Sequence, residues 1–159
     1  MAVGDEIRFD DPENQCFGCS QHNPRGLELT FRHVAPSEVE TRYVSDADLC
    51  GAPGIIHGGV QAAILDEAVG FAVHAHRSHQ RGDDPRADRQ RIVTLEFSLR
   101  YRRPAPAEVP LLVRGRVANE EPPDFHAEAE ILDLDENVLT SATARWRLLD
   151  DDDAPHSGQ

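Results

Sequence analysis

The sequence predicts an α+β fold in which an antiparallel sheet wraps around a single buried helix. Three observations predict it: two short runs of alternating polar and apolar residues come first, one long apolar run follows, and four more strand-like runs come after it. Alternation with a period of two is typical of half-buried strands, whereas a long apolar run without proline favours a buried helix. Because strands and helices do not alternate, the order argues against a parallel βαβ sheet.

The first third of the chain begins with a lead-in segment, residues 1–26, which is rich in Asp, Asn, Pro and Gly and therefore in turn-forming residues. We expect the lead-in segment to wrap around the domain proper, residues 27–149. The domain opens with two alternating runs that predict a hairpin, 27–31 and 39–43.

A glycine-rich loop leads into residues 60–75, which are apolar on nearly every side and predict a buried helix of about four turns. The polar residues 77–91 predict an exposed loop. Turn residues separate four further expected strands, 92–102, 109–118, 125–133 and 138–149. Residues 150–159 begin with a run of aspartates, and we expect this acidic tail to be disordered.

Length and charge exclude several classes of protein. A chain of 159 residues, 39% of them hydrophobic, has the size of one domain with a packed core. Its net charge of −13 argues against a nucleic-acid-binding protein, which needs a broad basic surface. The sequence contains no run long and apolar enough for a membrane span and no signal peptide. Three cysteines, an odd number, favour a reducing compartment, so we expect a cytoplasmic protein.

The entrance of the expected helix carries the groups best suited to catalysis. Asp66 and Glu67 lie within the apolar run, where a carboxylate without a partner is costly to bury. The plain explanation is that both acids face water or a second subunit. Gly58 and Gly59, however, place backbone N–H groups at a helix N-terminus, which favours a developing oxyanion and is typical of acyl transfer. His57 is placed either to donate to the same oxygen or to fix the loop.

Four sequence motifs together resemble one known family. Over residues 14–149 the chain is similar to hotdog-fold thioesterases of the PaaI-like and 4-hydroxybenzoyl-CoA thioesterase-like type. The resemblance rests on Cys16-Phe17-Gly18-Cys19, Asn23-Pro24-Arg25-Gly26-Leu27, Pro53 to Gly59 with Asp66-Glu67-Ala68, and Tyr101-Arg102-Arg103-Pro104. It implies a hotdog fold, hydrolysis of an acyl-CoA thioester, no cofactor beyond the coenzyme A of the substrate, and a homodimer or a tetramer of two dimers.

The resemblance also implies roles for individual residues. Asp66, nine residues after the loop histidine, would be the nucleophile or general base, and the Gly58 N–H would bind the thioester carbonyl. Thr94, contributed by the neighbouring subunit, would help to place the water. Some members have an asparagine where this chain has Gly51, so here the water would be positioned by Gln61 or Thr94. Glu67 would replace Asp66 if the helix were rotated.

The remaining expectations concern ligands. Arg100, Arg102 and Arg103 either pair with the phosphates of coenzyme A or form a solvated strand edge, and the other expected substrate-binding residues are Gly59, Gln61 and Glu67. Cys16 and Cys19 have the spacing of metal ligands, but no second such pair exists, so we expect no zinc site there. We also expect none at the three histidines near the helix end, His74, His76 and His79.

Two other functions remain open from the sequence. The first is a non-catalytic acyl-CoA binding module, because Gly51 departs from the family pattern and two acids compete for one role. The second is a hotdog dehydratase acting on 3-hydroxyacyl thioesters, although His57 opens the Gly-Gly turn instead of pairing with the helix acid. The identity of the acyl group also stays open, since the residues near the expected pocket permit aromatic or medium aliphatic chains, namely Phe71, Phe97, Ala62 and Ala63.

Overall fold

A computed structural model describes residues 4–9, 11–82, 84 and 91–149. The expected disordered tail at 150–159 lies outside the described residues, as does most of the second half of the expected loop at 77–91.

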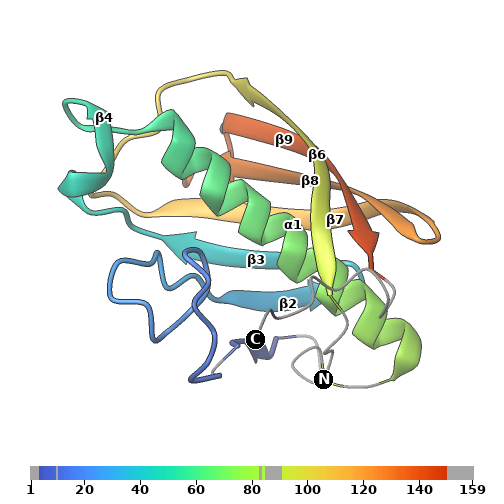
Figure 1. Cartoon of the computed structure of the whole chain (residues 1–159). Coiled ribbons are helices and arrows are strands. Elements are labelled where there is room, and N and C mark those ends of the chain that lie inside the picture. The colour runs from blue at the N-terminus through green and yellow to red at the C-terminus, as the bar shows by residue number, and fades with distance from the viewer. Residues whose placement is uncertain (1–3, 10, 83, 85–90, 150–159) are drawn as a thin grey trace.

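The predicted fold class is confirmed: one long helix packs against a large antiparallel sheet, as in the hotdog fold (Figure 1). Helix α1 (Gly58–Arg81) crosses a seven-stranded sheet of order β1-β2-β3-β7-β8-β9-β6. The strands are β1 (Glu6–Ile7), β2 (Phe31–Ala35), β3 (Glu38–Tyr43), β6 (Ile92–Tyr101), β7 (Leu111–Glu121), β8 (Asp124–Leu132) and β9 (Val138–Leu148). A short 3₁₀ turn (Ala47–Leu49) and a two-stranded sheet of β4 (Cys50–Ala52) and β5 (Ile55–Ile56) precede the helix.

The helix lies deep against the sheet because small residues meet at the contact. Leu65, Ala68 and Val69 are fully buried. A Cβ atom on Gly115 of β7 would lie 2.3 Å from the Ala68 carbonyl oxygen, so only glycine lets the helix backbone approach this closely. Among the described residues, no helix combines the length and hydrophobicity needed to span a lipid bilayer.

The helix is longer than the sequence predicts. It begins at Gly58 and continues to Arg81, so the expected loop at 77–91 begins five residues late. Arg77 and Ser78 are buried although their side chains are polar, because packing against the sheet extends the helix beyond its apolar run. The helix ends at Gly82, whose left-handed conformation (φ 71°) is the usual glycine stop.

The hairpin is confirmed as β2 and β3, but its first strand begins at Phe31 instead of Leu27. The alternation before Phe31 is real, since Leu27 and Leu29 are both buried. Their backbone N–H groups, however, donate to Phe17 and Gly18 carbonyl oxygens of the lead-in segment, at 2.8 and 2.9 Å. The lead-in segment is therefore bonded to the chain that enters the sheet, and it lies over the helix.

Candidate functional site

The helix N-terminus is capped by the residue that precedes it. His57 Nδ1 accepts a hydrogen bond from the Gly59 N–H at 2.9 Å, so a neutral His57 carries its proton on Nε2. His57 therefore fixes the loop, and its capping bond uses the Gly59 N–H that the sequence assigned to substrate. No acceptor among the described residues takes the Gly58 N–H. Of the two glycines, Gly58 is thus the available donor at the positive end of the helix dipole.

Gly51 is packed directly against this cap. A Cβ atom at Gly51 would lie 2.9 Å from His57 Cδ2 and 3.2 Å from its Cα. An asparagine therefore does not fit here while His57 keeps its capping position. The substitute proposed from the sequence, Gln61, is also committed elsewhere: it is buried, its amide donates to the Ile56 carbonyl at 2.8 Å and its carbonyl oxygen accepts from Thr140. Gln61 supports the loop through these two bonds, and it also lines the cavity beside the helix N-terminus.

Asp66 points toward strand β6. The Thr94 hydroxyl donates to Asp66 Oδ1 at 2.9 Å within one chain. Within one chain Thr94 thus already holds Asp66, and the contribution of Thr94 from a neighbouring subunit stays a prediction. The alternation of β6 is interrupted by a bulge between Thr94 and Glu96, which changes the direction of the strand at this point. Burial raises the pKa of Asp66, and the Thr94 hydrogen bond partly opposes that rise.

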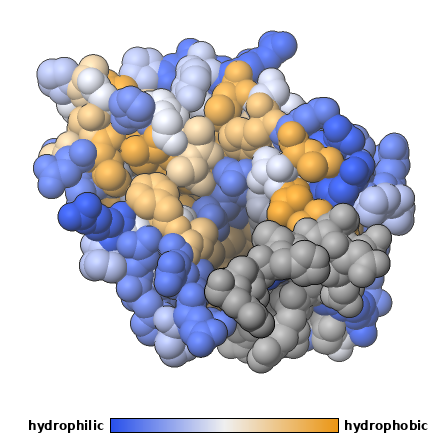
Figure 2. Space-filling model, in the orientation of Figure 1, coloured by the Kyte–Doolittle hydropathy of each residue, from blue (hydrophilic) through white to orange (hydrophobic). Residues whose placement is uncertain are grey.

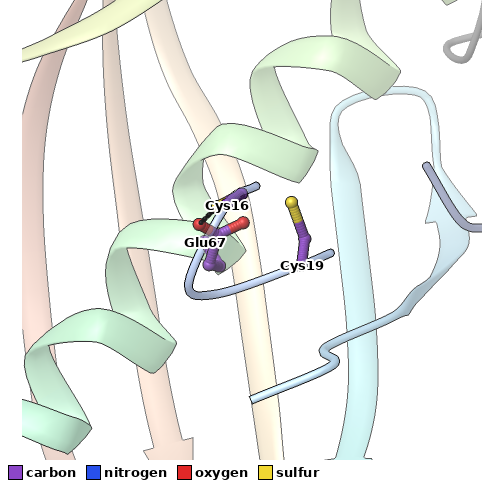
Figure 3. A group of neighbouring side chains, drawn as sticks. All are labelled: Cys16, Cys19 and Glu67. Carbon is purple, nitrogen blue, oxygen red and sulfur yellow. Dashed lines mark hydrogen bonds between the residues drawn. The ribbon is translucent and has the colours of Figure 1, made fainter. Parts of the chain in front are cut away.

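Glu67 points to a different element. Its side chain lies beneath Gly18 of the lead-in segment, where a Cβ atom would come within 2.3 Å of its carboxyl group. The Cys16 thiol lies 3.1 Å from Glu67 Oε1 (Figure 3). Burial raises the pKa of Glu67 to about 8. Glu67 therefore does not face β6, which leaves Asp66 as the carboxylate on that side of the helix.

Gly58 and Asp66 stand apart along the helix. They are eight positions apart, which corresponds to about 12 Å along the helix axis at the usual rise per residue. A carbonyl bound to the Gly58 N–H is therefore out of reach of Asp66 in the same chain. The two groups act on one substrate only if they come from two subunits.

A cavity of about 630 Å³ opens beside the helix N-terminus. It is lined by His57 and Gly58 and by Tyr101, Arg102 and Arg103 at the end of β6. The Tyr101 hydroxyl donates to the Gly58 carbonyl at 2.9 Å, so Tyr101 faces the helix. Because side chains alternate along a strand, Arg100 lies on the opposite face of the sheet, away from this cavity.

The face of the molecule that carries the helix exposes apolar side chains between hydrophilic ones (Figure 2). On β6, Leu95 and Tyr101 are 40% and 55% exposed. β6 is also the last strand of the sheet as far as the chain is described, and there it pairs along one edge only, with β9. An exposed apolar strand with an open edge is typical of a surface that binds another chain.

The cysteines and histidines considered from the sequence as possible metal ligands lie in different parts of the structure. The two ring nitrogens of His76 lie 2.8 Å from the Ser37 hydroxyl and 3.0 Å from a Glu120 carboxylate oxygen. Both nitrogens therefore have protein partners that fasten the helix end to the sheet. Within the described part of the chain, the group of three metal-ligating side chains lies elsewhere, at Cys16, Cys19 and Glu67. The sequence did not indicate that Glu67 joins the two cysteines, because it lies 51 residues after Cys16.

Comparison with known proteins shows which family the chain belongs to. A sequence model of the thioesterase superfamily matches residues 53–139, more than half of the chain. The chain belongs to the thioesterase superfamily. The match covers the helix with its capping loop and strands β6 to β8, and it reaches the start of β9. A search of curated proteins found no significant match.

Solved structures of thioesterase superfamily proteins have the same fold. One such protein has a TM-score of 0.63 and 22% identity, and the match covers 79% of this chain but only 56% of that one. The PaaI protein from the phenylacetic acid degradation operon of E. coli has a TM-score of 0.62 and 12% identity, covering 76% and 78% of the two chains. A phenylacetic acid degradation-related protein from Ralstonia eutropha JMP134 has a TM-score of 0.60 and 23% identity, covering 75% and 83%.

Proposed function

We propose that this member of the thioesterase superfamily is an acyl-CoA thioesterase. The observation that carries the proposal is the pairing of two features on one helix. Its N-terminus presents a Gly58 N–H without an acceptor among the described residues, and two turns later it carries a half-buried Asp66 carboxylate held by Thr94. An oxyanion donor and a poised carboxylate are what thioester hydrolysis needs.

The proposed active site is shared between two subunits of a homodimer. The separation of about 12 Å between Gly58 and Asp66 requires a second chain to complete the site. The open edge of β6 supports this arrangement, because its backbone groups are available to pair with a second copy. The same strand carries Thr94, which donates to Asp66, so the edge lies close to the proposed catalytic acid. A tetramer of two dimers is compatible with the same pairing.

The reaction begins when the thioester carbonyl binds the Gly58 N–H of one subunit. Asp66 of the other subunit removes a proton from a water molecule, whose oxygen attacks the carbonyl carbon. The negative charge then formed on the carbonyl oxygen is stabilised by the Gly58 N–H and the helix dipole. When the C–S bond breaks, the coenzyme A thiolate leaves and takes up the proton. If Asp66 attacks directly, the resulting anhydride is hydrolysed by water to the same products.

The coenzyme A phosphates are proposed to bind at the mouth of the cavity. Arg102 and Arg103 line it beside His57, and guanidinium groups bind phosphate by paired hydrogen bonds. Arg102 also donates to the Ser141 hydroxyl at 3.3 Å, which holds its side chain near the end of β6. Arg100 is not part of this proposal, because it lies on the opposite face of the sheet.

The proposal is tested by measuring thiol release from short, medium and aromatic acyl-CoA esters. We expect Asp66→Asn to lower kcat by about 10²–10⁴-fold, the usual contribution of a positioned base. Glu67→Gln should cost less, because its carboxylate faces the lead-in segment. Asp46→Asn, an exposed loop variant, is the matched control and should retain full activity. Full activity in a folded Asp66→Asn protein would contradict the assignment.

A non-catalytic acyl-CoA binding module is the second candidate, and Gly51 favours it. Its close packing against His57 excludes the asparagine that would orient the water. This candidate predicts that coenzyme A esters bind without thiol release, and that Asp66→Asn leaves the affinity unchanged. Calorimetric titration with a non-hydrolysable acyl-CoA analogue measures the affinity, and thiol release from the hydrolysable esters then separates the two candidates.

A further inference from the structure

Two cysteines of the lead-in segment lie beside Glu67, at the middle of α1 (Figure 3). The Cys16 and Cys19 sulfur atoms and one Glu67 carboxylate oxygen all lie within 4.8 Å of one another. Cys16 and Glu67 are half-buried and Cys19 is buried, so the ligand atoms are largely shielded from solvent. This arrangement plays no part in the proposed hydrolysis.

The three ligand atoms lie close enough together to be compared with a tetrahedral metal site. Around a zinc ion with Zn–S bonds of about 2.3 Å and Zn–O bonds of about 2.0–2.2 Å, neighbouring ligand atoms stand roughly 3.5–3.8 Å apart. Cys16 Sγ and Glu67 Oε1 lie 3.1 Å apart, slightly closer than two such ligands. Small side-chain rotations are enough to place all three atoms around one ion.

The backbone of the lead-in segment also suits metal binding. The Gly18 N–H donates to Cys16 Sγ at 3.3 Å, which favours the thiolate, the form of cysteine that binds metals. Glycine at position 18 leaves room for this carboxyl group, because a Cβ atom there would lie 2.2 Å from the Glu67 side chain and would force it to shift. The close approach of the two cysteines to Glu67 is therefore built into the packing of the loop on the helix.

The strongest electrostatic neighbours of the cluster among the described residues carry no positive charge. The groups that act most strongly on Cys16, Cys19 and Glu67 are one another, backbone groups and Asp66, and none of these is a cation. The chain contains no lysine. A buried carboxyl group keeps its charge only when a counter-charge lies beside it, and a divalent cation supplies one when it displaces the proton. Two thiolates with one carboxylate are a donor set suited to zinc, whereas Mg²⁺ and Ca²⁺ prefer oxygen alone.

We propose that Cys16, Cys19 and Glu67 bind one divalent zinc-type ion, which fastens the lead-in segment to the central helix. Three protein ligands leave the fourth tetrahedral position to a water molecule. This inference does not depend on the thioesterase activity, and it replaces the expectation from spacing alone that two cysteines without a second pair bind no zinc.

The test uses the full chain, freed of metal and kept reduced, and titrates it with Co²⁺ as the probe. We expect one equivalent to produce thiolate-to-cobalt charge-transfer absorption and the intense visible bands of tetrahedral Co²⁺, and Zn²⁺ to displace it. Cys16→Ser, Cys19→Ser and Glu67→Gln should each weaken binding by at least ten- to hundred-fold, the loss seen even for outer-shell partners of metal ligands. Cys50→Ser is the matched control, because Cys50 lies on β4, and should bind as the parent does.

A second measurement, made on the parent protein, tests the proposal even if the variants fail to fold. In the parent protein, hydrogen exchange is compared with Zn²⁺ and with a chelator, and we expect Zn²⁺ to slow exchange at residues 16–20 and to raise Tm with zinc concentration. Absence of stoichiometric binding overturns the proposal. So do cobalt bands that persist in folded Cys16→Ser or Cys19→Ser protein, or protection confined to the histidines at the helix end, because each places the ion elsewhere.

Discussion

Asp66 and Glu67 are adjacent in sequence, yet their carboxyl groups have different surroundings. Asp66 accepts from Thr94 on β6, whereas Glu67 lies beneath the lead-in segment against Cys16. Adjacent residues on a helix point about 100° apart, so a single helix faces two different elements with them. The sequence showed that two acids occupy an apolar helix, but only the position of the lead-in segment separates their roles.

Asp124 offers a test of electrostatics at the start of β8. It accepts hydrogen bonds from Arg147 at 2.6 and 2.9 Å and from Arg145 at 2.9 Å. These bonds, those of Arg147 above all, lower the pKa of Asp124 to about 2. An unfolded Asp has a pKa of about 3.9, so the ion pairs stabilise the fold above that pH and lose their effect as the pH falls toward 2.

We therefore expect Asp124→Asn to be less stable than the parent at pH 7, with the difference narrowing below about pH 4. Urea denaturation at several pH values between 7 and 3 measures the free energy of unfolding of the variant and of the parent. Asp46→Asn serves as the loop control and should follow the parent throughout. A stability difference that is the same at pH 3 as at pH 7 would show that lost packing, and not the charge, is responsible.

At the scale of elements, the contact between α1 and β7 depends on Gly115. Its missing side chain makes room for the Ala68 carbonyl, which belongs to the helix backbone and cannot move aside as a flexible side chain can. We expect Gly115→Ala to lower the free energy of unfolding by about 1–3 kcal/mol or more, because it overpacks this contact. Thr143→Ala, an exposed position on β9, is the control and should stay within about 0.5 kcal/mol of the parent.

The urea midpoint and the near-ultraviolet circular dichroism of Gly115→Ala report the two possible responses of the structure. A lower midpoint with unchanged dichroism means that the helix has shifted slightly and the fold survives. An unchanged midpoint would mean that the helix does not rest on Gly115, contrary to the packing described above.

At the scale of the whole molecule, the proposed division of the site between two subunits predicts complementation. Gly58→Pro removes the N–H donor while keeping the helix, since proline is favoured at the first helical position. His57, at φ −56° and ψ 137°, already has the conformation that a following proline requires. Gly58→Pro and Asp66→Asn should each be inactive alone.

Mixed after unfolding and refolding together, the two variants should recover roughly a quarter of the parent activity, because half of the dimers are mixed and each of those has one intact site of two. Light scattering on the same samples reports the dimer. No recovery from a mixture that forms dimers would place Gly58 and Asp66 of one site in the same chain, and a monomer would contradict the shared site altogether.

Much of this architecture followed from local pattern. The strands at 92–102, 125–133 and 138–149 were expected to within one residue at each end, because alternation is strong and turn residues bound each run. The start of β2 was wrong, since Leu27 and Leu29 alternate in burial but bond to the lead-in segment. The helix end was wrong as well, since packing against the sheet and not propensity extends it to Arg81.

Sequence reasoning could place those residues of the candidate site that are close together along the chain. The loop from His57 to Gly59 and the acid nine residues after His57 form one local unit, so their positions on the helix were accessible from spacing. The contacts of Glu67 with Cys16, and of Gly51 with His57, depend on how separate segments pack. The commitment of Gln61 to Thr140 likewise joins residues 79 positions apart, which no local pattern reports.

The seating of the helix against Gly115 has a consequence for how such a protein would change its substrate over evolution. With the Ala68 carbonyl lodged against β7, the helix has no freedom to slide along its axis. Gly58 and Asp66 are therefore both held in place relative to the sheet, and their interval along the helix is set by the helical rise. In the proposed enzyme, acceptance of a longer or bulkier acyl chain would then come from the side chains and loops around the cavity, while Gly58 and Asp66 of each subunit keep their places on the sheet.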